Sequence, residues 1–156
     1  ACLHGQAMLH HNLKCNNVLL WPATRGFIAK VADIGLATGT GTGATTVTRP
    51  SAESEFAYKA PECIEYDDYS TGKFEVYAFA IVSWEVLTAQ QPWHGMSMIK
   101  MMKAVLMKQE RPPLPAASGE SAALIPLIER CWAQEPSDRP PFAEICKMPL
   151  LGARES

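Results

Sequence analysis

The segment His10-His11-Asn12-Leu13-Lys14-Cys15-Asn16-Asn17 is the first of three short motifs that determine the fold class of this chain. The second is Asp33-Ile34-Gly35, which follows two short apolar runs, and the third is Ala60-Pro61-Glu62. Each motif alone would pass for an ordinary polar loop. Their order and their spacing along one chain are far more specific than any one of them.

The composition is that of a globular domain. The chain has 156 residues, of which 47% are hydrophobic and 19% charged, so it can bury a core and is not a disordered chain. Lys and Arg number 14 against 16 Asp and Glu, which gives a net charge of −2 and no basic surface for nucleic acid. The longest mostly apolar run, residues 77–89, is too short to span a bilayer. We therefore expect neither a nucleic-acid partner nor a membrane segment.

The cysteines favour a reducing compartment. They are odd in number and never form a CxxC pair, so neither a disulfide scaffold nor a zinc site is expected. The N-terminus has no signal-peptide pattern, and these features together predict a cytoplasmic location. The chain also begins abruptly at Ala1 without an initiator Met, as expected for a portion of a longer protein.

Two short apolar runs in the first third predict strands. Val18–Leu20 and Phe27–Val31 are rich in strand-forming residues, and residues 22–26 between them contain Pro and Gly, so we expect a hairpin-like pair. Gly and Thr dominate the segment 38–46, which has no apolar anchor and predicts a mobile loop.

The rest of the chain, from Glu62 onward, has helical periodicity. Residues 73–89 are apolar on nearly every face and predict a helix buried all round. Ser97 can cap a second helix, in which Ile99, Met102 and Leu106 share one apolar face.

Prolines divide the last part of the chain. The proline-rich segment 110–117 predicts a loop, and a further helix follows in which Leu124, Ile128, Cys131 and Trp132 share one face. More prolines precede a last short helix around residues 142–146. Two small strands and about five helices make a predominantly helical unit.

The three motifs together resemble the catalytic machinery of protein kinases. In that family the catalytic loop reads H-R-D-L-x-x-x-N and is followed by D-F-G and then A-P-E. Here His10, Leu13 and Asn17 match the first motif, and the other two follow in the same order. The resemblance places the catalytic loop at residues 10–17 and the activation segment at residues 33–62.

The resemblance extends over residues 1–148 and leaves a tail at residues 149–156. Residues 73–85 (KFEVYAFAIVSWE) are similar to the central helix of the kinase large lobe, and Cys131-Trp132 with Asp138-Arg139-Pro140 is similar to its closing signature. These features point to the tyrosine-kinase-like group of serine/threonine kinases. The implied fold is the predominantly α-helical large lobe (α+β), with a small strand pair beside the catalytic loop and the small lobe missing.

The resemblance implies a role for each matching residue in binding ATP and Mg²⁺. Asp33 and Asn17 are the expected Mg²⁺ ligands, and both also serve the bound nucleotide. Lys14 would neutralise charge on the transferred phosphoryl group and favours Ser/Thr specificity. Leu19 would form the apolar floor beneath adenine, backed by Val82 and Val86.

Other matching residues have structural roles in the family. His10 and Ile34 would stack in the column that holds the Mg²⁺ loop. Glu62 and Arg139 would form a buried ion pair that ties the activation segment to the helical base. Glu75, where the family has Asp, would hold the backbone of the catalytic loop.

The catalytic loop departs from the family at the residue that matters most for chemistry. Asn12 stands at the position of the catalytic Asp, and an amide oxygen is barely basic, so the loss of this base should cost about 10²–10⁴-fold in rate. His11 replaces an Arg that meets phosphorylated activation loops. Glu55 lies near the substrate-docking loop and could pair with Lys14.

The resemblance leaves two classes of function open. No glycine-rich lid, Val-Ala-x-Lys strand or Glu-bearing helix precedes His10, so this chain alone should not turn over ATP. The parent protein is then either a slow kinase acting on a protein substrate, or a pseudokinase that binds nucleotide or a signalling partner as a scaffold or allosteric activator. The residues upstream of Ala1 would distinguish the two.

Overall fold

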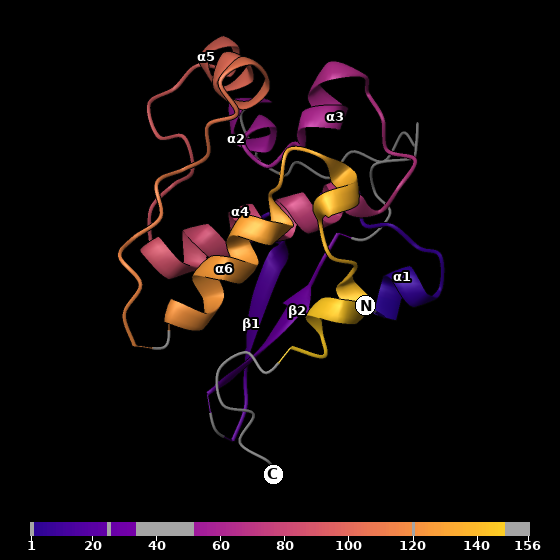
Figure 1. Ribbon diagram of the computed structural model, residues 1–156. Helices are drawn as coiled ribbons and strands as arrows, with labels where there is room; N and C mark the ends of the chain where they lie inside the picture. Colours follow the sequence, from indigo (N-terminus) through magenta and orange to yellow (C-terminus); the bar gives the residue numbers. More distant parts are fainter. Residues whose placement is uncertain (1, 25, 34–51, 120, 149–156) are drawn as a thin grey trace, which may run out of the picture.

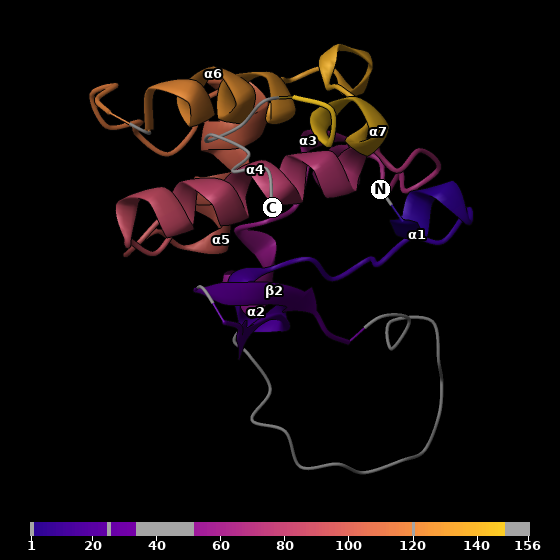
Figure 2. The same ribbon diagram turned by 90° about the horizontal axis from the view of Figure 1, so that it is seen from below.

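The computed structural model describes residues 2–24, 26–33, 52–119 and 121–148, and the fold in them is predominantly helical (Figure 1). A long helix, α4 (Lys73–Thr88), runs through the middle of the molecule. In Figure 2 it lies between α6 (Ser121–Cys131) on one side and a two-stranded sheet on the other. This arrangement agrees with the helical large lobe and strand pair expected from the sequence.

The predicted hairpin is present and slightly longer than expected. Strand β1 (Val18–Pro22) pairs antiparallel with β2 (Phe27–Val31), with Val18 opposite Val31 and Pro22 opposite Phe27. Gly26 in the turn has φ +80°, a left-handed conformation that favours glycine. The hairpin is unusually exposed, since Leu19 is 56% and Leu20 63% accessible to solvent.

Helix α4 is largely buried over residues 74–82, as its sequence predicts, whereas its last turn is half-buried and Val86 is exposed. It contributes more residues to the core than any other described element, and Tyr77, Ala80 and Ile81 are fully inaccessible. Two hydroxyls of the helix bond to carbonyls one turn earlier: Ser83 donates to the Phe79 carbonyl and Thr88 to the Trp84 carbonyl, both at 2.8 Å. The helix ends at Ala89, whose φ of 52° is left-handed.

Helix α6 and the C-terminal helix pack onto α4 to complete the core. In α6, Ile128 and Cys131 are buried, and Trp132 directly after it is buried too, so the predicted face is confirmed. Residues 110–117 form no helix or strand, as expected. A 3₁₀ turn (Pro136–Asp138) then leads into α7 (Phe142–Ile145), the predicted last short helix.

One helix face was predicted wrongly. The segment after Ser97 is helical, as α5 (Met98–Met102) and a π-helical turn (Lys103–Met107), but Ile99 is 63% exposed and Met102 is also exposed. The buried side carries Met101, Ala104 and Val105 instead. The segment has two apolar stripes, and periodicity alone does not say which of them packs on the rest of the chain. Ser97 is the N-cap residue, although its side chain makes no capping hydrogen bond.

Four short elements complete the described structure. Helices α1 (Cys2–Gly5) and α2 (Ala52–Phe56) and the 3₁₀ turn at Cys15–Asn17 are too short to show a period in the sequence. Helix α3 (Pro61–Glu65) begins with a proline, whose fixed φ suits a first helical position. The predicted loop at residues 38–46 and Ile34 lie outside the described residues. In the described part, no helix is long and apolar enough to cross a membrane.

Thiol labelling should separate the cysteines by burial. Burial raises the pKa of Cys15 and Cys63 to about 12 and that of Cys131 to about 11, whereas Cys146 is exposed. Only the thiolate reacts, and a thiol with a pKa of 12 is ionised to about one part in 10⁴ near pH 8. Among the four cysteines with described side chains, we expect alkylation of the folded protein near pH 8 to modify Cys146 before Cys15, Cys63 and Cys131, as measured by mass spectrometry of its peptides. Equal rates at all four thiols would contradict the burial described here.

Candidate active site

The catalytic-loop segment is anchored to the central helix through one carboxylate. Glu75 lies in the first turn of α4 and is buried. Its Oε1 accepts hydrogen bonds from the backbone N–H groups of His10 and His11, the latter at 2.7 Å. Charge-assisted bonds of this kind are stronger than bonds between neutral groups, so the loop backbone is fixed relative to the helix.

A residue that the sequence did not single out completes this anchor. The second oxygen of Glu75 lies 2.6 Å from Nε2 of His4, which comes from α1. The His4 ring also packs edge-on against the Phe142 ring, with 4.9 Å between the ring centroids. Gly72 leaves room for the His4 ring, because a Cβ added at Gly72 would lie only 2.7 Å from a ring carbon of His4. No motif contains His4, so only the fold could reveal its place beside the loop.

Within the loop, His10 is buried and bonded on both ring nitrogens. Its Nδ1 accepts from the backbone N–H of Asn12 at 3.2 Å, and its Nε2 lies 2.7 Å from the Ala32 carbonyl. A neutral ring protonated at Nε2 satisfies both contacts. His10 therefore joins the loop to the end of β2, one residue before Asp33, while its expected neighbour Ile34 lies outside the described residues.

Asn17 and Asp33 offer oxygen atoms that suit Mg²⁺. Asn17 is buried, and its side-chain N–H donates to the Asn12 carbonyl at 2.7 Å, which leaves its amide oxygen as the group to meet a cation. Asp33 is exposed, with a left-handed φ of 61°, two residues after the end of β2. The Ala32 N–H donates to the Asn17 carbonyl at 2.8 Å and holds the two segments together. Carboxylate and amide oxygens are hard ligands of the kind that Mg²⁺ prefers.

Among the described residues, no group of three or more His, Cys, Asp and Glu side chains could hold a metal ion by itself. A pair such as Asn17 and Asp33 fits Mg²⁺ nevertheless, because this ion keeps several waters and is commonly held by one or two protein groups plus phosphate oxygens.

Lys14 forms an ion pair that the sequence suggested. Its side chain is buried, and its Nζ lies 3.1 Å from Oε1 of Glu55, which comes from α2. The Glu55 side chain is about half exposed, at 48%. Lys14 thus already has a carboxylate partner at the place where a phosphoryl group would need its charge.

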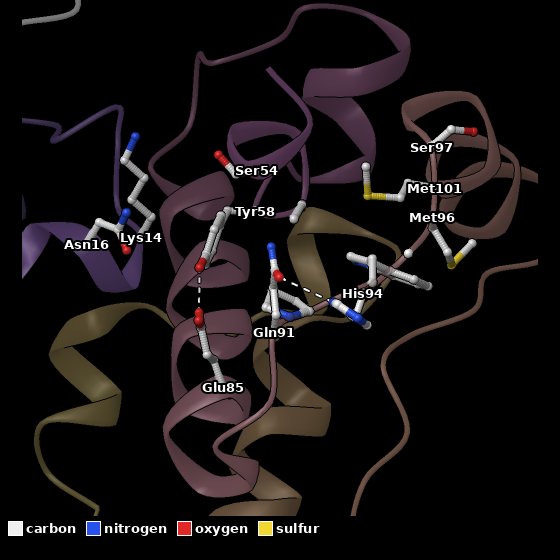
Figure 3. Close-up of a pocket in the computed structure, with 14 residues that line it drawn as sticks. Lys14, Asn16, Ser54, Tyr58, Glu85, Gln91, His94, Met96, Ser97 and Met101 are labelled. Carbon is white, nitrogen blue, oxygen red and sulfur yellow. Dashed lines mark hydrogen bonds between the residues drawn. The ribbon is translucent and has the colours of Figure 1, made fainter. Parts of the chain in front are cut away.

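A groove with a volume of about 680 Å³ opens beside Lys14 (Figure 3). Lys14 and Asn16 lie at one end, and His94 and Met96 lie at the other, with Tyr58 and Glu85 between them. The Tyr58 hydroxyl donates to Oε2 of Glu85 at 2.5 Å. Two causes raise the pKa of Tyr58 well above its ordinary value: burial is the larger, and the hydrogen bond to the Glu85 carboxylate is the second. No sequence motif predicts the Tyr58–Glu85 pair.

The buried ion pair between Glu62 and Arg139 is bidentate. Arg139 donates to the two Glu62 oxygens at 2.6 and 2.8 Å. Its remaining donors reach the carbonyls of Ala133, Lys73 and Gln134, so every guanidinium N–H has an acceptor. The pair ties α3 to the chain before α7, and both partners are buried.

A family model described as "Protein tyrosine and serine/threonine kinase" matches residues 1–148. The chain belongs to this kinase family. The expected membership of the kinase family is thereby confirmed.

Several curated relatives carry kinase names. The "Serine/threonine/tyrosine-protein kinase HT1" of Arabidopsis thaliana is 42% identical over 145 residues, covering 92% of this chain and 34% of its own length. The "Dual specificity protein kinase shkC" of Dictyostelium discoideum is 36% identical over 138 residues, 88% of this chain and 26% of its own. The "Mitogen-activated protein kinase kinase kinase 11" of Rattus norvegicus is 33% identical over 151 residues, 92% of this chain and 17% of its own. The chain therefore spans about a third or less of these kinases.

Compared with the kinase pattern, the structure brings most of the motif residues together. Glu75, His10, Asn12 and Asn17 form one connected set of hydrogen bonds. The expected adenine floor stays a prediction. Val82 is buried, but Leu19 on the hairpin is exposed, and Val86, meant to back it, is 74% exposed.

Proposed function

We propose that this chain is the large-lobe portion of a tyrosine-kinase-like Ser/Thr kinase domain whose phosphoryl transfer from ATP-Mg²⁺ is impaired by Asn12. The observation that carries the proposal is the loop scaffold. Glu75 holds the His10 and His11 amides, and Asn17 holds the Asn12 carbonyl, so position 12 sits on a fully supported loop. The scaffold of the family is kept while its base is replaced.

The chemical reason lies in the proton of the substrate hydroxyl. Bound ATP-Mg²⁺ supplies the phosphoryl group, and the hydroxyl oxygen of Ser or Thr forms its new bond to the γ-phosphorus as the bond to ADP breaks. The hydroxyl proton must leave as this happens. A carboxylate at position 12 would accept it, whereas the amide of Asn12 can orient the hydroxyl but leaves its proton to solvent. Restoring the carboxylate with Asn12→Asp and measuring the transfer rate tests this account.

A second candidate function is a pseudokinase that acts as a nucleotide-binding scaffold or allosteric partner. The 3.1 Å ion pair between Lys14 and Glu55 favours it. Lys14 would otherwise neutralise charge that develops on the phosphoryl group, and a fixed carboxylate beside it opposes that role. In this reading the site keeps the shape of a kinase but lacks both the base and a free lysine.

The remaining proposals concern the cell. We place the protein in the cytoplasm with a protein substrate or signalling partner and without a nucleic-acid partner. The four described cysteine thiols and the net charge of −2 support this.

Nucleotide binding should depend on the two Mg²⁺ ligands. In a thermal-shift titration of the intact protein with ATP and Mg²⁺, we expect stabilisation that Asp33→Ala removes. At a ligand concentration about 100 times Kd, the stabilisation of the wild-type protein by nucleotide amounts to about 2.7 kcal/mol. Asp67→Ala is the matched control, because Asp67 is also exposed and left-handed, with φ 53°, and lies outside the loop. If wild type does not shift at millimolar nucleotide, or if Asp33→Ala shifts as wild type does, the assigned ligands are wrong.

A further inference from the structure

The segment formed by α5 and its π turn is apolar on two sides. Met101, Ala104 and Val105 face the rest of the chain and are buried. The residues outside this buried side include Ile99, Met102, Lys103 and Leu106. Ile99 is 63% exposed and Met102 is exposed, while Leu106 is half-buried. We call these four residues the outer face of α5.

The position of the segment leaves this face open. In Figure 1, α5 lies at the periphery of the molecule, away from the α4–α6 core. The π turn at Lys103–Met107 follows directly, with the Lys108 N–H donating to the Lys103 carbonyl at 3.2 Å. Met107, at the end of this turn, is 78% exposed.

The charge around the outer face has one sign. Lys100, Lys103 and Lys108 are all exposed, and no acidic residue occurs between Met98 and Gln109. Lys108 pairs with Glu110 at 3.4 Å, whereas no ion pair involves Lys100 or Lys103 in the described part of the chain. An exposed apolar stripe edged by unpaired positive charge suits a partner with the opposite pattern.

We propose that the outer face of α5 docks an acidic amphipathic helix of a partner protein. The apolar side of that helix would cover Ile99 and Met102, and its Glu or Asp residues would meet Lys100 and Lys103. Helices recognise apolar faces in this way through residues at i, i+3, i+4 and i+7, and methionine adapts its shape to different partners. This function is independent of phosphoryl transfer, because Met101, which lines the groove beside Lys14, lies on the buried side of the helix.

Two other occupants fit less well. A second copy of this chain, docked face to face about a two-fold axis, would place the lysines of one copy against those of the other. A membrane surface needs a larger basic cluster, commonly of 4–8 Lys or Arg, and the chain as a whole carries a net charge of −2.

The test uses three labelled synthetic peptides and the intact protein, with binding measured by fluorescence anisotropy. The first peptide has Leu at i, i+3, i+4 and i+7 with Glu flanking them, the second has the same composition in scrambled order, and the third has Lys in place of Glu. We expect saturable binding of the first peptide only. Ile99→Asp should weaken it at least about 10-fold, as for a central apolar anchor. Lys103→Glu should weaken it less, and added salt should weaken it further.

The controls are matched to the two substitutions. Tyr66→Asp changes an aromatic residue that is 72% exposed at the end of α3, and Lys147→Glu reverses an exposed lysine after α7. Both should bind the first peptide as wild type does. All variants should keep the wild-type unfolding temperature, because Ile99 and Lys103 are exposed.

Several outcomes would overturn the proposal. Absence of binding, equal binding of the three peptides, or wild-type affinity in Ile99→Asp would each do so. A dimer seen by sedimentation that Ile99→Asp dissociates would assign the face to a second copy instead. Flotation with vesicles of phosphatidylcholine and phosphatidylserine, lost in Ile99→Asp, would assign it to a membrane.

Discussion

Asn12→Asp should raise the rate of phosphoryl transfer by the intact protein by about 10²-fold or more. The new carboxylate would stand on a loop whose backbone is already held by Glu75 and Asn17, so it can accept the hydroxyl proton without rebuilding the site. The measurement is the initial rate with ATP-Mg²⁺ and a generic Ser/Thr substrate, compared with wild type. Asn12→Ala serves as the matched variant that removes the amide without adding a base.

Two further variants distinguish the effect of the missing base from the effects of Asp33 and Glu55. Asp33→Ala added to Asn12→Asp should abolish the gain, because the Mg²⁺ ligand is lost. Glu55→Gln added to Asn12→Asp should raise the rate further, since it frees Lys14 from its ion pair. If Asn12→Asp stays at the level of Asp33→Ala and Glu55→Gln does not help, the missing base is not the main defect. The scaffold function is then the better account.

Arg139→Ala should lower the free energy of unfolding by about 3–5 kcal/mol. The substitution leaves the Glu62 carboxylate buried without its bidentate partner and removes the donors to three carbonyls. Urea unfolding followed by circular dichroism measures the loss. Arg130→Ala is the matched control, because Arg130 also forms a 2.8 Å ion pair, with Glu144, but both side chains are about half exposed. That substitution should cost no more than about 1 kcal/mol.

The double replacement of Glu62 and Arg139 by methionine adds a second check. An apolar pair leaves no buried charge, so it should cost less than Arg139→Ala alone. Equal losses for Arg139→Ala and Arg130→Ala would contradict the idea that burial sets the value of this pair.

The parts of the fold that sequence reasoning predicted are those with long or repeated patterns. The central helix has sixteen residues and little polar interruption, so its burial followed directly. The hairpin was marked by two strand-forming runs around a Pro/Gly turn. The buried face of α5 could not be predicted, because both of its sides are apolar. Contacts of the π turn with α3, and the position of Met101 at the groove, determine which side is buried.

The candidate site shows the same division. Motif order located Asn12, Lys14, Asn17 and Asp33, because the chemistry of a family fixes residue types at fixed spacing. His4 beside Glu75 and Tyr58 beside Glu85 belong to no motif and lie 71 and 27 positions apart in the sequence. These contacts bring α1 and the chain after α2 against α4, and the local sequence does not specify them.

The carboxylate of Glu75 has a consequence for the evolution of the loop at residues 10–17. Loops usually open on their own, well before the core of a protein unfolds. Here the amides of His10 and His11 donate to Glu75 in the first turn of the central helix, so we expect the loop to open only together with that helix. Its shape is maintained by folding stability and does not depend on the side chain at position 12. A catalytic residue can therefore be exchanged there, in either direction, while the architecture around it is inherited unchanged.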